Sequence, residues 1–149
     1  MTTVIHREVE RARSGEHPQL IARLRSGFAV LSERQVLRGY SMLLPDPVVA
    51  DLNALPGPSR SAFLLDMTAL GDALLAVTAA AGVDYEILGT ARPALHAHVI
   101  PRYDDEEVSL RQRPFWFYDW SVAATFEPAR DRELIEAMVR ELRGLGLLS

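Results

Sequence analysis

The chain has 149 residues, of which 48% are hydrophobic and 24% charged, and it contains no cysteine. This length and balance indicate one soluble globular domain, and the lack of thiols excludes disulfide scaffolds, thiolate zinc sites, iron–sulfur clusters and cysteine nucleophiles. The formal net charge of −4 gives no general attraction to nucleic acid or to an anionic membrane, so we expect neither as a partner and expect any phosphate binding to be local.

The first predicted element is a helix over residues 3–14. Thr3 is a suitable N-terminal cap, arginine and glutamate residues alternate at helical spacings, and Gly15 with Pro18 ends the helix. This start of mixed charge is neither a signal peptide nor a transit peptide, so we expect a cytoplasmic protein.

Three strands are predicted next. Two short apolar segments, residues 20–24 and 28–32, are separated by a Ser-Gly pair, which is the pattern of a β-hairpin. A third strand, residues 40–44, follows Gly39 and must end near Pro45, because proline has no N–H to donate to a sheet.

The longest helix is predicted over residues 59–81, where apolar residues recur with a period of 3.6 and Gly82 provides the stop. Residues 62–83 are apolar enough to suggest a membrane span. Asp66 and Asp72 interrupt them, however, and charges at mid-span are costly. We therefore interpret this segment as a buried core helix.

The remaining pattern completes one expected domain over residues 1–149. Residues 85–88 and 95–100 have strand character and form a second predicted hairpin, and an amphipathic helix over residues 131–143 ends at Gly144. Three strands, a helix and two further strands, with helices at both ends, predict an α+β fold with a mostly antiparallel sheet.

His96 and His98 are the candidate chemical groups. Alternate residues of a strand project to the same face, so the two imidazoles share one surface. A neutral imidazole is a nucleophile near pH 7, and its neighbour can donate a proton or a hydrogen bond. The spacing alone leaves three interpretations open: half-exposed histidines without a role, a cupin-type metal site, and nucleophilic phosphate chemistry. The metal site lacks its usual glutamate, because residues 101–103 are Pro-Arg-Tyr, and the other histidines, His6 and His17, lie in or beside the polar N-terminal helix.

Residues 95–102, Leu-His-Ala-His-Val-Ile-Pro-Arg, resemble the signature of the histidine triad (HIT) superfamily of nucleotide hydrolases and transferases. Residues 28–32 (Phe-Ala-Val-Leu-Ser), 39–45 (Gly-Tyr-Ser-Met-Leu-Leu-Pro) and 85–89 (Tyr-Glu-Ile-Leu-Gly) extend the likeness, particularly to the fragile-histidine-triad branch of dinucleoside polyphosphate hydrolases. The resemblance implies a HIT-like α+β fold, with about five antiparallel strands and a long helix. It also implies pairing with a second copy in a homodimer.

The resemblance implies a mechanism that needs no metal or other cofactor. His96 matches the middle histidine of the triad, which attacks the α-phosphorus of a nucleotide to form a nucleotidyl-histidine that water hydrolyses. His98 matches the third histidine, which holds the phosphate and the departing group. Ala94 stands in place of the first triad histidine, and Tyr40 replaces a further histidine but keeps a hydroxyl for hydrogen bonding. Two functions therefore stay open: a hydrolase, and a catalytically silent nucleotide-binding module with the same fold.

Other matched positions are candidates for substrate binding. Ser32 aligns with the residue that holds the ribose hydroxyls, and Thr90 stands where relatives often place asparagine. Arg102 can pair with a phosphate or form a surface ion pair with Asp104 or Glu106.

Residues 111–120 contain five aromatic side chains within six positions, next to two arginines. Such a segment offers a stacking surface for a base and charge for phosphates, or it packs in the core or against a second copy. Trp116 is our candidate there for substrate contact, and Arg92 is a further candidate for phosphate. We expect His96→Ala to leave the fold intact and Ala94→His not to lower activity.

Overall fold

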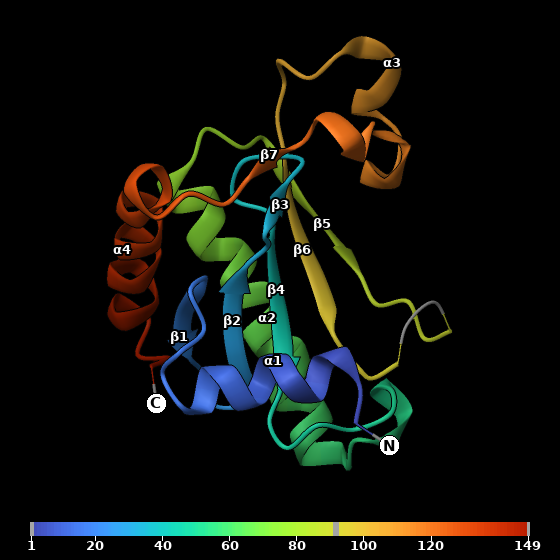
Figure 1. Cartoon of the computed structure of the whole chain (residues 1–149), viewed down its shortest axis with the longest axis vertical. Helices are drawn as coiled ribbons and strands as arrows, with labels where there is room; N and C mark the ends of the chain where they lie inside the picture. The colour runs from blue at the N-terminus through green and yellow to red at the C-terminus, as the bar shows by residue number, and fades with distance from the viewer. Residues whose placement is uncertain (1, 91–92, 149) are drawn as a thin grey trace.

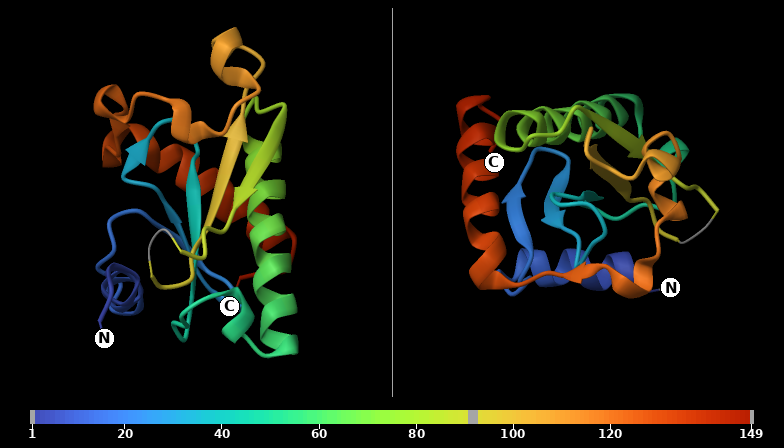
Figure 2. Two further views of the ribbon diagram at one scale, coloured as in Figure 1. Left: turned by 90° about the vertical axis from the view of Figure 1, so that its right-hand side faces the viewer. Right: turned by 90° about the horizontal axis from the view of Figure 1, so that it is seen from above.

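The computed structural model describes residues 2–90 and 93–148, and its centre is a five-stranded antiparallel sheet in the order β1-β2-β4-β6-β5. Figure 2 shows helix α1 crossing one face of this sheet and helix α2 covering the other, with α4 beside β1. The strands of the sheet are β1 (Leu20–Arg23), β2 (Gly27–Leu31), β4 (Ser41–Pro45), β5 (Gly82–Glu86) and β6 (Ala97–Arg102). The α+β fold expected from the sequence is confirmed.

Helix α1 (Val4–Arg13) begins at the predicted cap. The Thr3 side chain accepts a hydrogen bond from the His6 backbone, and the Thr3 N–H donates to the His6 ring, so the two residues form a capping box. The buried face of α1 packs against apolar side chains of β2 and β4. This contact fixes the helix across the sheet face on which the site lies.

The first hairpin is confirmed, with β1 and β2 paired antiparallel and β2 paired in turn with β4. Gly27 is required where the strands approach each other, because a Cβ there would lie 1.9 Å from the carbonyl oxygen of Leu44. Along the chain, β2 is followed by a short strand that our sequence analysis did not predict, β3 (Arg34–Gln35). This strand is not part of the five-stranded sheet and pairs with β7 (Ala124–Thr125). This small second sheet brings the chain after the aromatic segment next to the end of β2.

The long helix α2 (Gly57–Val77) starts two residues before its predicted first residue, Ser59, and ends four residues before its predicted last residue, Ala81. Thr78 adopts an extended conformation, and its hydroxyl donates to the Leu74 carbonyl at 2.6 Å. Gly82 is therefore not the helix stop that we expected but the first residue of β5. No helix within residues 2–90 and 93–148 is both long and apolar enough to cross a membrane.

The main core lies between the sheet and two helices, α2 and α4 (Pro128–Gly144). Phe63, Leu70 and Leu74 of α2 and Met138 and Leu142 of α4 are fully buried there. The predicted C-terminal helix is thus present, and it begins three residues earlier than expected.

The second hairpin is also confirmed, with β5 and β6 paired antiparallel. Strand β6 starts at Ala97, so His96 lies one residue before the strand rather than within it. His98 is opposite Met42 in the neighbouring strand β4. Ala97 and Val99 belong to the main core, as expected for the residues on the other face.

After β6 the chain forms three short helical turns above one end of the sheet (Figure 1). They are α3 (Val108–Arg111), η2 (Phe115–Phe117) and η3 (Trp120–Val122). The last two carry the aromatic side chains, and η2 places Phe115 and Trp116 beside His98 of β6.

Candidate active site

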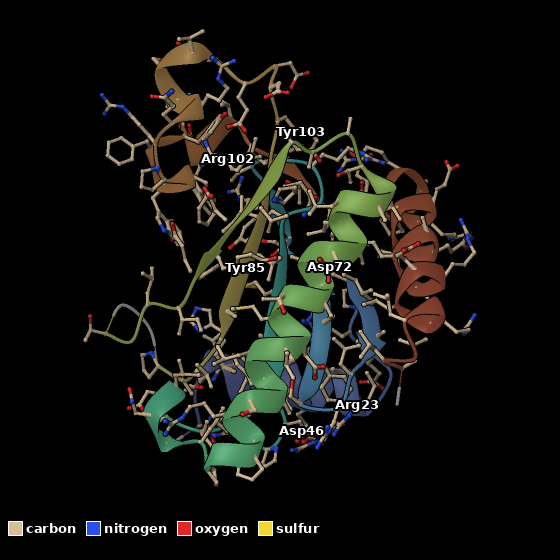
Figure 3. The ribbon with its side chains drawn as sticks, turned by 180° about the vertical axis from the view of Figure 1, so that it is seen from behind. Arg23, Asp46, Asp72, Tyr85, Arg102 and Tyr103 are labelled. Atoms are coloured by element: carbon tan, nitrogen blue, oxygen red, sulfur yellow. The ribbon has the colours of Figure 1, made fainter. Side chains whose placement is uncertain are left out.

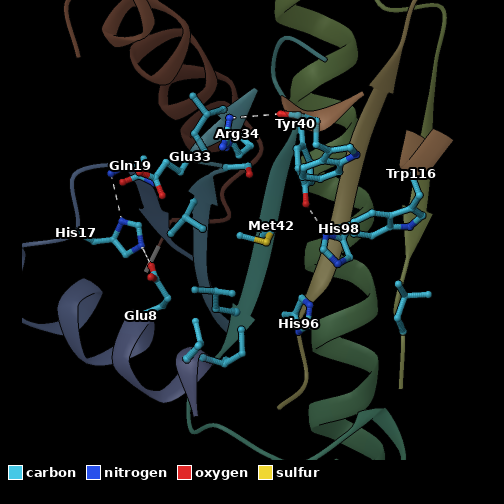
Figure 4. Close-up of a pocket in the computed structure, with 18 residues that line it drawn as sticks. Glu8, His17, Gln19, Glu33, Arg34, Tyr40, Met42, His96, His98 and Trp116 are labelled. Carbon is cyan, nitrogen blue, oxygen red and sulfur yellow. Dashed lines mark hydrogen bonds and ion pairs between the residues drawn. The ribbon is translucent and has the colours of Figure 1, made fainter. Parts of the chain in front are cut away.

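A cavity of about 560 Å³ lies on the α1 side of the sheet (Figure 4). Its lining comes from α1, the turn before β1, strands β2 and β4, the histidine segment and the aromatic segment. This volume is in the range of small-molecule binding sites.

His96 and His98 both line this cavity and lie side by side, with ring centroids 4.8 Å apart and planes at 77°. The two residues are only 6% and 5% exposed, so the expectation of half-exposed strand histidines is wrong. The aromatic segment explains the burial of His98, because the rings of Phe115 and Trp116 lie 5.9 Å and 5.2 Å from its ring.

The orientation of His96 is set by the backbone. Its Nδ1 atom is 2.9 Å from the carbonyl oxygen of Ala94, and a carbonyl can only accept, so Nδ1 carries the hydrogen. In the neutral ring the lone pair is then on Nε2. Because the backbone carbonyl supplies this contact, alanine at position 94 is sufficient to provide it.

The orientation of His98 is set by Tyr40. The tyrosine hydroxyl is 2.6 Å from Nδ1 of His98, and the tyrosine ring packs edge-on against Phe115 at 4.9 Å. Tyr40 therefore contacts the imidazole of His98 through its hydroxyl. If the hydroxyl donates to Nδ1, the proton of a neutral His98 ring is on Nε2.

Two further predicted residues, Ser32 and Trp116, line the same cavity. Ser32 is 6% exposed and follows β2 directly. Trp116 is 41% exposed, contacts Glu86 through its indole N–H, and stacks on Trp120 with ring centroids 5.1 Å apart and planes at 8°. The structure thus brings five predicted residues together: Ser32, Tyr40, His96, His98 and Trp116.

Arg102 is not among the residues that line the cavity, which corrects our interpretation of it as a phosphate ligand. Its guanidinium binds Asp84 at 2.8 Å and Glu106 at 2.9 Å, and it donates to three backbone carbonyls, those of residues 110, 111 and 113. The ion pair with Glu106 that we kept as the alternative is present. It is buried rather than on the surface, with side-chain exposures of 11% and 3%.

These contacts make Arg102 the anchor of the segment that carries the aromatic side chains. Glu106 also accepts hydrogen bonds from the Tyr103 backbone and the Tyr118 hydroxyl. Burial and the bond to Glu106 raise the pKa of Tyr118 to about 12. Burial opposes ionisation of Glu106, but its bonds with Arg102 and Tyr118 outweigh this and lower its pKa.

Thr90 lies exposed in a turn and does not line the cavity, so the structure does not place it with the other candidates. Arg92 lies outside the described residues. Within the described ranges, no group of three or more histidine, aspartate or glutamate side chains is arranged to hold a metal ion. The five-stranded sheet with its small two-stranded companion also differs from the two large packed sheets of cupins.

Our sequence analysis missed two residues at the opposite end of the cavity, Glu8 and His17, which contact each other. A signal for Glu8 was present: it is three residues after Ile5 and four before Ala12, on the buried stripe of α1. His17 gave no local signal, because it follows the helix in a turn and its partner is nine residues away.

Comparisons with known proteins support the fold. No protein-family model and no curated protein sequence matches the chain. Among solved structures, a histidine triad (HIT) protein from Sinorhizobium meliloti is 18% identical with a TM-score of 0.72, and the match covers 89% of this chain and 94% of that one. A histidine triad protein from Marinobacter aquaeolei is 17% identical with the same TM-score, covering 91% and 95%.

A third structure is a zinc-bound histidine triad family protein from Mycobacterium smegmatis. It is 20% identical with a TM-score of 0.59, and the match covers 89% of this chain and 91% of that one. The chain therefore has the histidine triad fold, as the resemblance of residues 95–102 predicted.

Proposed function

We propose that the protein is a HIT-type nucleotide hydrolase or transferase in which His96 attacks the α-phosphorus of its substrate. The observation that carries this proposal is the hydrogen bond from His96 Nδ1 to the Ala94 carbonyl. It leaves the lone pair of the neutral ring on Nε2, which is the form required of a nucleophile.

The chemistry would proceed in two displacements. Nε2 of His96 forms a bond to the α-phosphorus as the bond to the bridging oxygen breaks, and the leaving group departs with the electron pair. His98 acts as the acid in its doubly protonated form: the proton on Nε2 passes to the leaving oxygen, and the neutral ring that results stays in contact with the Tyr40 hydroxyl through Nδ1. Water then attacks the same phosphorus and gives a proton to Nε2 of His98, which restores the acid. The P–N bond breaks, its electron pair returns to the His96 imidazole, and a nucleoside monophosphate leaves.

The rest of the cavity supports a nucleotide as the substrate. The half-buried Met42, beside the fully buried Val30 and Leu44, is an apolar contact for a base, and the Ser32 hydroxyl is a partner for the ribose. Stacked Trp116 and Trp120 provide a planar surface beside His98 for the leaving group. A dinucleoside polyphosphate or a nucleotide conjugate has this combination of parts.

A second function, nucleotide binding without catalysis, is favoured by one observation. Ala94 is 4% exposed and packs with residues of α1, so the position of the first triad histidine is part of the core here. A protein that has lost catalysis can keep the fold and the cavity.

Chromatographic detection of released nucleoside monophosphate distinguishes the hydrolase from the silent binding module. The panel comprises diadenosine tri- and tetraphosphate, an adenosine phosphoramidate and a nucleotide sugar, with wild type compared with His96→Ala and His96→Gln. Turnover that is lost in folded variants would establish the hydrolase, and equal turnover in wild type and both variants would refute the mechanism. Nucleotide binding without turnover would favour the silent module.

We also propose that two copies pair into a continuous sheet, as the resemblance implies. Strands β1 and β5 are the outer strands of the sheet, and outer strands offer backbone groups for pairing. Light scattering of the purified chain tests this, and a monomer at micromolar concentration would refute it.

A further inference from the structure

The cavity has a second polar end, formed by Glu8 and His17, which the proposed hydrolysis does not use. Glu8 lies on α1, and His17 lies in the turn before β1. Figure 4 shows the pair beside Gln19, with Met42 between it and His96. A ligand with its phosphate at His96 and its base beside Met42 would therefore have a carboxylate within the same cavity.

His17 holds this carboxylate in place. The backbone N–H of Gln19 donates to Nδ1 of His17 at 3.2 Å, so the proton of the neutral ring is on Nε2, the atom that contacts Oε2 of Glu8. The His17 side chain is 1% exposed, whereas that of Glu8 is 29% exposed. Glu8 is thus the member of the pair that a ligand can reach, and His17 is a positioning residue behind it.

Glu8 presents negative charge and acceptor oxygens to the cavity. The hydrogen bond from His17 lowers the pKa of its carboxyl, although burial opposes this, and nearby Arg11 and Arg7 lower it further. Oε1 is 4.0 Å from the Arg11 guanidinium, which is longer than a hydrogen bond. A carboxylate has about four acceptor positions, so capacity for a ligand is left after the bond to His17.

We propose that Glu8, positioned by His17, selects nucleotides whose base presents N–H donors to the carboxylate, guanine above the others. This rests on the proposed function, because it places the base between the histidines and α1. Guanine carries an N–H and an amino group side by side and can donate to both carboxylate oxygens. Adenine and cytosine offer one amino group, and uracil offers one N–H between two carbonyl oxygens that a carboxylate repels.

The test is isothermal titration of the intact protein with GMP, IMP, AMP and UMP, using wild type, Glu8→Gln and the control Glu10→Gln. Glu10 is on the same helix, but its side chain is 72% exposed and pairs with Arg13. We expect GMP to bind wild type about 10-fold more tightly than UMP, with IMP between them because it lacks the amino group. Glu8→Gln should bring the GMP-to-UMP ratio close to 1, and Glu10→Gln should leave it unchanged.

His17→Gln supplies a second measurement, with ribose 5-phosphate as a probe that has no base. A positioning role predicts a smaller GMP-to-UMP ratio and an unchanged affinity for ribose 5-phosphate, whereas general damage to the cavity would weaken both. Equal binding of all four nucleotides to wild type would overturn the selectivity and leave the proposed function standing. A protein that neither binds nor cleaves any nucleotide would overturn both.

Discussion

The hydroxyl of Tyr40 is 2.6 Å from Nδ1 of His98, so a tyrosine on β4 orients one of the two histidines that line the cavity. Tyr40 is itself fixed, because it is 2% exposed and packs against Phe115 and Trp120. Tyr40 therefore provides a directed hydrogen bond to His98 and forms part of the aromatic wall of the cavity.

Tyr40→Phe removes this hydrogen bond and little else. Without the hydroxyl, the tautomer and orientation of His98 are less well defined, and we expect turnover of the best panel substrate to fall about 100-fold with little change in KM. Steady-state kinetics measure this. Tyr103→Phe is the matched control, because the Tyr103 hydroxyl donates to the Arg38 carbonyl away from the histidines. A Tyr40→Phe protein as active as wild type would show that His98 needs no orienting hydroxyl.

Ala94→His, which the sequence suggested would be harmless, now has a different expected outcome. Ala94 is buried among Ile5, Phe28 and Leu44, so an imidazole would overfill this cluster. We expect a loss of about 1–3 kcal/mol in the free energy of unfolding and weaker activity. Urea denaturation measures the first, and a variant as stable as wild type would show that α1 can move aside.

The sequence was most informative where local pattern decides structure. Alternation placed His96 and His98 together, and glycine and proline marked the hairpins and the end of β4. The end of α2 was misjudged, because Thr78 leaves the helix although the three alanines that follow it are strong helix formers. The role of Arg102 was misjudged for another reason: its partners come from β5 and from the loop after β6, and only the folded loop brings them together.

Glu106→Ala should loosen the aromatic segment. It removes the buried partner of Arg102 and the acceptor of Tyr118, while Asp84 remains paired with Arg102, so we expect a loss of about 1–3 kcal/mol in the free energy of unfolding. Because this segment carries Trp116 to His98, we expect altered tryptophan fluorescence and reduced turnover as well as a lower Tm. Glu107→Ala is the control, since this neighbouring glutamate is exposed and accepts a hydrogen bond from Ser109 rather than from Arg102. Unchanged fluorescence and Tm in Glu106→Ala would mean that the segment is held by its apolar contacts.

The pH dependence of stability should identify Asp46 as a link between α1 and β1. Its carboxylate accepts hydrogen bonds from Arg13 of α1 and Arg23 of β1, at the end of the molecule away from Arg102 (Figure 3). The bond with Arg13 lowers the pKa of Asp46; burial opposes this, and Arg23 lowers it further.

Because the pKa is lower in the folded than in the unfolded protein, where it is about 3.9, the stabilisation is fully present above that value. It is lost as the pH falls through the folded pKa, since the unfolded chain then binds more protons. We expect Asp46→Asn to lower Tm by a few degrees at pH 7, and the difference from wild type to shrink as the pH is lowered below about 4. Asp104→Asn, at an exposed position, should track wild type throughout. Thermal unfolding between pH 2 and pH 7 measures this, and a difference that is constant with pH would show that Asp46 acts through its shape rather than its charge.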